Sequence, residues 1–201
     1  MTQKIVVPLF SSPIAIYKID EDFLVDTHYQ FIDIHSEDVK QTYVSKRKDV
    51  LEDYPNLKNK IIECFNDYKD NIFCYTKTEF RITTSWMSKT EPGGCSQYHK
   101  HSNSMFSAVH YFDIDEKDAP LQFKTNSVLS NYCLSVSERN IYNTDTQSFA
   151  PQKNYIIIFP SHLEHRIGHH RGSKTRYSLA CNFYPVGELG GGDSYINIQL
   201  D

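Results

Sequence analysis

The sequence predicts a mainly β protein in which an N-terminal helical region supports an antiparallel sandwich or barrel. From Phe80 onward, short runs rich in β-branched and aromatic residues alternate with turn residues, and no helical pattern lies between them. Before that point, the segment after Pro55 repeats apolar residues at helical spacing. The 201 residues fit a single domain, which we divide into an N-terminal strand and helix support, residues 1–79, and a β core, residues 80–201.

The predicted helix begins after Pro55, and Asn56 is its candidate cap. The residues of its apolar stripe are Leu57, Ile61, Phe65 and Tyr68, with Ile62 and Ile72 widening it. We expect this stripe to pack on a sheet. Upstream, residues 5–19 are expected to be extended and broken by two prolines, whereas residues 20–53 are polar and show no clear period.

The strands predicted for the core are RITTSWM, SMFSAVHYFDI, APLQFKT, NYCLSVS, NYIIIFP, RYSLACNFY and SYINIQL. Turn residues separate them at 91–94, 160–162, 169–174 and 187–194. The stretch 125–152 is polar, and its length predicts a loop or hairpin over the mouth of the fold, where substrate selection often lies.

Composition disfavours several classes of protein. The net charge of −4 and a pI near 6.1 disfavour a general nucleic-acid surface. The five cysteines are odd in number and form no C-x-x-C pair, so we expect reduced thiols in a cytoplasmic protein. No apolar run approaches the ~20 residues that span a bilayer, and the N-terminus lacks a signal-peptide core, so no membrane partner is predicted.

The nine histidines are the unusual feature of the composition, and their spacing singles out three. His99 and His101 stand two apart before a predicted strand, so an extended backbone points both imidazoles to one side. Imidazole suits Fe, Zn, Cu or Ni. A third ligand must come from a distant strand, and His165 directly follows the most apolar one. By itself, an H-x-H pair in a loop is more often solvated than ligating.

Other histidines have structural explanations. His162 is expected to pack or to form a hydrogen bond, and His110 is expected to be a satisfied histidine of the core or of an interface. His169 and His170 stand beside an arginine and a glycine, so we expect them to be solvated in a hairpin turn.

Arg176 opens an apolar strand in the run RYS. Arginine offers a planar fork of donors that matches a carboxylate, and an unpaired buried cation is costly, so this position predicts an anion nearby. Ser178 points the same way along the strand and adds a hydroxyl donor. The alternative is a salt bridge from the arginine to an internal Asp or Glu.

Three segments together resemble a known family: ITTSWMSKTEPGG…HKHSNSMFSAVHYF, FPSHLEHRI and TRYSLACNF. They resemble the 2-oxoglutarate- and iron(II)-dependent oxygenases related to prolyl hydroxylases, of the type found in bacteria and tailed phages. The resemblance covers about Ile82 to Phe183. It implies a double-stranded β-helix (a cupin-like jelly roll), Fe(II) and 2-oxoglutarate as cofactors, and hydroxylation of an unidentified substrate with release of succinate and CO2.

The resemblance also implies roles for single residues. His99 and His165 correspond to the family's two iron-binding histidines, and His101 stands where the wider superfamily has a carboxylate. The residues that match the anchor for the distal carboxylate of 2-oxoglutarate are Arg176, Ser178 and Tyr111. The resemblance implies no catalytic residue beyond the metal centre.

Whether His101 binds the metal is left open by the sequence. The carboxylates that could replace it, as the nearest in sequence, are Glu164, Asp113 and Asp115. Each ligating imidazole should also have a neighbour that fixes its tautomer. The candidates for that neighbour are Asn103, Ser104 and Asn182.

Two other functions share these features. A cupin-like enzyme with three histidine ligands would not use 2-oxoglutarate and would not need Arg176. A non-catalytic jelly roll would keep the motif for structure or bind a partner through a sheet. The substrate, a small molecule or a protein side chain, and the oligomeric state are not specified by the sequence.

Overall fold

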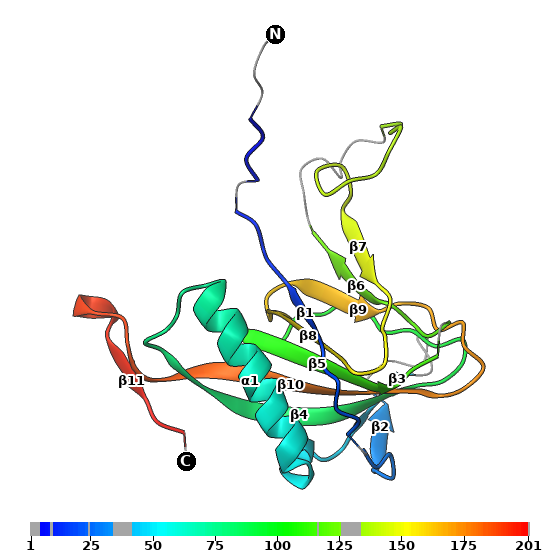
Figure 1. Cartoon of the computed structure of the whole chain (residues 1–201), viewed down its shortest axis with the longest axis horizontal. Coiled ribbons are helices and arrows are strands. Elements are labelled where there is room, and N and C mark those ends of the chain that lie inside the picture. Colours follow the sequence, from blue (N-terminus) through cyan, green and yellow to red (C-terminus); the bar gives the residue numbers. More distant parts are fainter. Residues whose placement is uncertain are drawn as a thin grey trace.

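A computed structural model describes residues 5–8, 10–23, 25–33, 42–115, 117–125 and 134–200. Two antiparallel sheets face each other, and one long helix covers the outer face of the larger sheet (Figure 1). This arrangement confirms the predicted mainly β architecture with helical support.

The larger sheet contains β1 (Ala15–Lys18), β2 (Phe31–Asp33), β3 (Thr42–Ser45), β4 (Glu79–Thr90), β5 (Phe106–Asp113), β8 (Tyr155–Pro160), β10 (Arg176–Leu189) and β11 (Ile196–Ile198). The smaller sheet contains β6 (Leu121–Lys124), β7 (Thr146–Phe149) and β9 (Glu164–Ile167). The helical elements are η1 (Val50–Asp53), α1 (Pro55–Asn71) and η3 (Gly192–Ser194). The strand order is β1-β8-β5-β10-β4-β3-β2 in the larger sheet, with β11 paired to β10, and β7-β6-β9 in the smaller.

Helix α1 begins at Pro55, with Tyr54 as its N-cap residue, so the expectation that Asn56 is the cap was wrong. Proline fits the first helical position because it has no N–H to leave unpaired there. The predicted stripe is confirmed, since its four main members are buried: Leu57, Ile61, Phe65 and Tyr68. Ile72 is 53% exposed because it follows the last helical residue. In the described part of the chain, no helix is long and apolar enough to cross a membrane.

Alternation along the central strands sorts side chains into two layers. Along β10, Leu179 and Phe183 belong to the core beneath α1, whereas Arg176, Ser178 and Ala180 line the space between the two sheets. Successive side chains of a strand point to opposite faces, so residues two apart in the sequence share that inner space. The candidate site is built there.

Four strands were not predicted: β2, β3, β7 and β9. Each has three or four residues and contains polar side chains, so none shows an apolar period. In β3, for example, Ser45 accepts a hydrogen bond from the Met87 backbone at 3.0 Å, and Thr42 donates to the Cys95 carbonyl at 2.9 Å. Conversely, the predicted strand NYCLSVS is no strand over residues 134–137; its first residues, 131–133, lie outside the described part.

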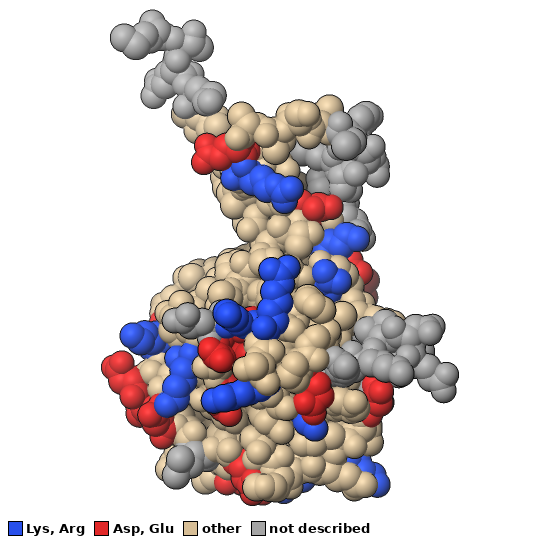
Figure 2. All heavy atoms as spheres, turned by 90° about the vertical axis from the view of Figure 1, so that its right-hand side faces the viewer, with Lys and Arg blue, Asp and Glu red and all other residues tan. Residues whose placement is uncertain are grey.

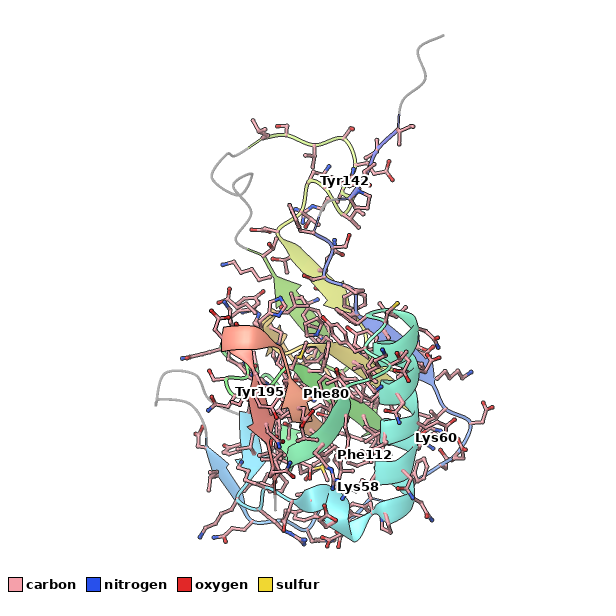
Figure 3. The ribbon with its side chains drawn as sticks, turned by 90° about the vertical axis from the view of Figure 1, so that its left-hand side faces the viewer. Lys58, Lys60, Phe80, Phe112, Tyr142 and Tyr195 are labelled. Carbon is pink, nitrogen blue, oxygen red and sulfur yellow. The ribbon has the colours of Figure 1, made fainter. Side chains whose placement is uncertain are left out.

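The connection between β6 and β7 projects from the body together with the N-terminal segment (Figures 1 and 2). Val7 and Phe10 of that segment share a surface groove with Tyr142, which Figure 3 places on the same projection. On the face shown in Figure 2, acidic and basic side chains are interspersed.

Candidate metal and cosubstrate site

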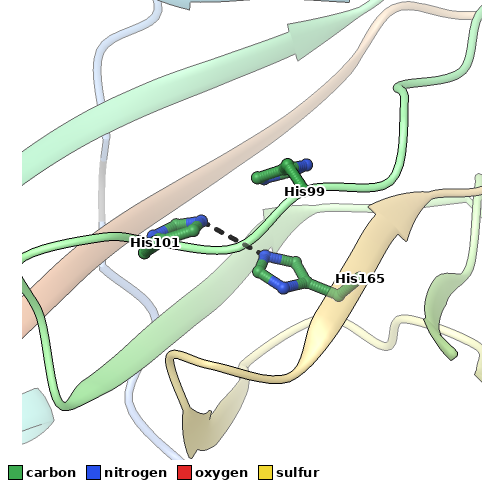
Figure 4. Close-up of side chains that lie close together, drawn as sticks. All are labelled: His99, His101 and His165. Carbon is green, nitrogen blue, oxygen red and sulfur yellow. Dashed lines mark hydrogen bonds between the residues drawn. The ribbon is translucent and has the colours of Figure 1, made fainter. Parts of the chain in front are cut away.

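Three imidazoles meet between the two sheets (Figure 4). His99, His101 and His165 each offer a ring nitrogen, and these nitrogens lie within 4.8 Å of one another. Nε2 of His101 is 3.2 Å from Nε2 of His165. The structure therefore brings together the three residues that the spacing had singled out.

Backbone pairing holds these imidazoles in place. His99 and His165 exchange two N–H···O=C bonds of 2.9 Å, so the loop before β5 runs along β9 like an extra strand. The His101 N–H donates to the Ser161 carbonyl at 3.1 Å. Because His99 and His101 are two apart on extended chain, both rings turn toward β9.

An oxygen acceptor lies beside Nδ1 of every ring. The acceptors are the Gln97 carbonyl for His99 at 3.0 Å, the Leu163 carbonyl for His165 at 2.7 Å and Oδ1 of Asn182 for His101 at 2.7 Å. An acceptor at Nδ1 requires the ring proton there, which leaves the lone pair on Nε2. Lone pairs facing each other at 3.2 Å repel unless a cation lies between them, so this donor set fits a metal ion.

Burial keeps the inner imidazoles neutral. Desolvation, followed by the charge of the neighbouring His99, lowers the pKa of His165 to about 3. Desolvation also lowers the pKa of His101 to about 4. At neutral pH both rings are thus free to ligate, and as neutral ligands they leave the charge of a divalent ion uncompensated.

In the described part of the chain, no carboxylate joins this group of histidines. The carboxylates considered from the sequence were Glu164, Asp113 and Asp115. Glu164 precedes His165 in β9 and so points to the opposite face of the smaller sheet. The geometry favours three imidazoles over two imidazoles and a carboxylate.

The same cavity continues to Arg176 at the start of β10. The arginine is 1% exposed, and its Nε and Nη1 have no hydrogen-bond partner among the described residues. Its guanidinium carbon lies 5.2 Å from the ring centroid of Tyr111, whose buried hydroxyl is also unpartnered. Ser178 lines the same wall. No described acid forms the ion pair that was the alternative reading of Arg176, so the buried guanidinium fits an anionic ligand.

Residues 84–182 match the family model described as "Putative 2OG-Fe(II) oxygenase". The matched segment contains all three histidines and Arg176. This segment belongs to the 2OG-Fe(II) oxygenase family. No curated protein matches the sequence.

Solved structures agree with this family in fold. An oxidoreductase of the 2OG-Fe(II) oxygenase family from Burkholderia pseudomallei is similar with a TM-score of 0.55 and 13% identity, over 78% of this chain and 72% of that one. The epimerase SnoN from nogalamycin biosynthesis, solved with Fe3+ and alpha ketoglutarate, is similar with a TM-score of 0.54 and 10% identity, over 78% of this chain and 68% of that one. The carbocyclase SnoK is similar with a TM-score of 0.53 and 10% identity, over 74% of this chain and 65% of that one. The predicted double-stranded β-helix, or jelly roll, is confirmed.

His170 of this oxygenase-family segment is 1% exposed, so the expectation of a solvated residue was wrong. The segment 169–174 crosses from the smaller sheet to the larger one instead of closing a hairpin. The Nε2–H of His170 donates to the Lys174 carbonyl at 2.7 Å, and Nδ1 of His170 lies 3.6 Å from Asp118. A Cβ at Gly172 would lie 2.6 Å from the His170 ring, so glycine is required there. These contacts hold the chain entering β10, and with it the backbone of Arg176.

His162 and His169 are both exposed. The expectation for His169 is confirmed, whereas His162 does not pack as expected, because it lies at the turn between β8 and β9. Because they are exposed, His162 and His169 provide control substitutions for the buried histidines.

Beside the histidines, the cavity wall is aromatic and apolar. The Trp86 ring lies beside the His101 ring, with centroids 5.2 Å apart. Further wall residues include Val44, Val109, Leu121 and Ile167. The described residues of the 125–152 stretch do not line this cavity; they include β7, which pairs with β6, and a place over the mouth of the fold stays a prediction.

His110 lies in the core as predicted, but it is not satisfied. It is fully buried on the outer face of β5, edge to face with Phe23, and neither ring nitrogen has a well-formed hydrogen bond among the described residues, since the Tyr155 backbone makes only a weak contact with the ring. Desolvation lowers its pKa from 6.5 to about 4, and the Tyr155 backbone offsets only part of this shift.

This buried neutral imidazole is expected to make the fold sensitive to acid. Below pH 6.5 the unfolded chain takes up a proton that folded His110 resists, so the free energy of unfolding falls from pH 6.5 down to about 4. The slope from one such group is at most about 1.4 kcal/mol per pH unit. His110→Phe should flatten this dependence in urea titrations at pH 5 and pH 7.5, followed by circular dichroism. The exposed His169→Phe is the control, and equal slopes for His110→Phe and the unsubstituted protein would contradict the expectation.

Proposed function

We propose that the chain is an Fe(II)- and 2-oxoglutarate-dependent dioxygenase that hydroxylates an as yet unidentified substrate and releases succinate and CO2. The observation that carries this proposal is one cavity with two unlike ends. Three Nε2 lone pairs converge at one end, and an unpaired buried guanidinium lies at the other. 2-Oxoglutarate has a keto-acid group that chelates metals and a second carboxylate that suits arginine.

The proposed roles follow the two ends of the cavity. His99, His101 and His165 hold iron through Nε2, each with its proton on Nδ1. Arg176 binds the distal carboxylate of the cosubstrate through its planar fork, and hydroxyl donors complete the contact. These donors are Ser178 and Tyr111. When bound, iron activates dioxygen, so that oxidative decarboxylation of 2-oxoglutarate is coupled to insertion of one oxygen atom into a C–H bond of the substrate.

The protein contributes orientation and a dry environment. The wall around the histidines contains Val109, Leu121 and Ile167, which exclude water from the space between the two ligand-binding ends. Low dielectric strengthens the attraction between the guanidinium and a carboxylate. It also keeps His101 and His165 deprotonated at Nε2 over the physiological pH range.

Two rival functions explain less of this geometry. A three-histidine enzyme that does not use 2-oxoglutarate has no role for an unpaired guanidinium in the same cavity. A non-catalytic jelly roll has no role for ring lone pairs that face each other. As partners we propose a small molecule or a protein side chain as substrate, with no nucleic acid or membrane. We place the protein in the cytoplasm, since the four described cysteines are all unpaired.

Ligand-dependent stability tests the proposal before any substrate is known. We expect Fe(II), added without oxygen, to raise the unfolding temperature of the protein, and 2-oxoglutarate to raise it further only when metal is present. With oxygen admitted, slow formation of succinate without substrate should follow. Metal binding without an effect of 2-oxoglutarate would favour the rival metal enzyme. Failure to bind any divalent metal would favour the non-catalytic jelly roll.

A further inference from the structure

His101 differs from the other two histidines in what fixes its ring. His99 and His165 each use the backbone carbonyl of the residue two positions earlier in the chain. His101 uses a side chain, Oδ1 of Asn182, from a strand 81 residues away. The ring at the position of the missing carboxylate therefore depends on tertiary packing, whereas its two partners are fixed locally.

Asn182 is itself held at its own position. The register between β10 and β4 shifts between Asn182 and Phe183, and such a bulge redirects the side chain beside it. The amide Nδ2 donates to Oγ1 of Thr84 at 3.2 Å, which directs Oδ1 toward His101. Ser107 donates to the same Oδ1 at 2.8 Å, so both lone pairs of that oxygen are used.

Behind Ser107 lies a cluster of hydroxyls, of which Ser107 and Ser161 are buried and Ser104 is half-buried. Ser107 and Ser161 are 2.7 Å apart, and Ser161 and Ser104 are 2.8 Å apart. Each hydroxyl can donate once, and Ser107 uses its proton on Asn182, so Ser161 donates to Ser107. Ser104 donates to the Phe106 carbonyl at 2.9 Å. Hydrogen bonds aligned in one direction polarise one another, which strengthens the Ser107 bond that holds Oδ1 in place beside His101.

We propose that Asn182, supported by the hydroxyls of Ser161 and Ser107, is a positioning residue that presents His101 to the metal with its proton on Nδ1. The inference rests on the proposed metal site. A neutral acceptor fixes the ring tautomer without adding negative charge, so the three imidazoles remain neutral ligands. Without the acceptor, His101 can rotate or place its proton on Nε2, and either change removes a ligand.

Substitutions at Asn182 separate positioning from folding. Asn182→Ala removes the acceptor, and we expect it to weaken Fe(II) or Co(II) binding by about 10- to 100-fold. Asn182→Asp keeps an acceptor of the same size, so metal affinity should recover and the Co(II) absorption spectrum should resemble that of the unsubstituted protein. Asn71→Ala, at an exposed amide that donates a hydrogen bond to Asp67 and lies outside the group of histidines, is the matched control and should change neither quantity.

The tautomer of His101 gives a readout that needs no metal. Nitrogen NMR of metal-free protein, labelled in its imidazoles, should show His101 protonated at Nδ1, and Asn182→Ala should shift it toward a mixture of tautomers. A His101 protonated at Nε2 in the unsubstituted protein would overturn the inference. Wild-type metal affinity and Co(II) spectrum in Asn182→Ala would do so as well. If Asn182→Ala does not fold, Asn182→Leu, which fills the same space without an acceptor, tests the same contact by the same two measurements, and an unchanged tautomer and affinity there would overturn it.

These results are distinct from failure of the proposed function. If the unsubstituted protein binds no divalent metal, the proposed oxygenase function falls, and the positioning of His101 is then judged by its tautomer alone. If the unsubstituted protein binds metal and responds to 2-oxoglutarate, but Asn182 has no effect on affinity or tautomer, the oxygenase stands and only the inference fails.

Discussion

Replacing His165 by alanine is expected to abolish iron binding and, with it, succinate formation. His165 is the most buried of the three histidines, and it is tied to both others, by backbone bonds to His99 and by the facing ring nitrogen of His101. Its loss leaves an H-x-H pair on a partly exposed loop, where two ligands on adjacent positions bind a divalent ion weakly. Metal content after anaerobic loading and gel filtration, followed by a succinate assay, measures the effect.

The matched control for this variant is His162→Ala. His162 stands three residues earlier in the same turn, but it is exposed and lies outside the metal-ligating group. The His162→Ala variant should bind iron and form succinate like the unsubstituted protein. Circular dichroism of both variants separates lost ligation from lost folding. Full iron content or unchanged turnover in His165→Ala would refute the assignment of the metal centre.

The site histidines were predictable because their pattern is local. An H-x-H before a strand and a histidine after the most apolar strand are readable from spacing. That the H-x-H pair and His165 lie together in space could not be read from spacing. Their proximity depends on β9, a short strand of mixed polarity that pairs with the loop holding His99. The acceptors of the ring protons divide in the same way. Those of His99 and His165 lie two residues away, whereas Asn182 of β10 was one of three candidates until the packing of that strand was known.

Errors in the sequence-based expectations have a common physical origin. The prediction for His170 failed because a turn composition of histidine, arginine and glycine does not tell a hairpin from a crossing between sheets. In the crossing, Gly172 allows His170 and Asp118 to approach closely under the start of β10. His110 shows the converse, since its burial followed from its place in an apolar strand, but the absence of a partner for its ring could not. Burial follows from periodicity, while hydrogen-bond satisfaction depends on the neighbouring elements.

Replacing Arg176 by methionine is expected to weaken binding of 2-oxoglutarate while leaving metal binding by the histidines unchanged. The substitution removes a buried cation whose Nε and Nη1 have no hydrogen-bond partner among the described residues, so the free energy of unfolding should stay the same or rise. Metal content should be unchanged, because the three histidines lie at the other end. Affinity for 2-oxoglutarate should fall by about 100-fold or more, since two charge-assisted hydrogen bonds to the distal carboxylate, worth about 1.5–3 kcal/mol each, are lost.

Arg176→Lys separates charge from geometry at this position. Lysine keeps the positive charge but not the planar fork, so the loss of 2-oxoglutarate affinity should be smaller than for methionine. Arg81→Met, at an exposed arginine paired with Glu79, is the control for the substitution itself. The increase in unfolding temperature caused by 2-oxoglutarate in the presence of metal measures affinity without a substrate. If Arg176→Met retained that increase in full, the arginine would not bind the cosubstrate, and its missing partner would have to be a different anion.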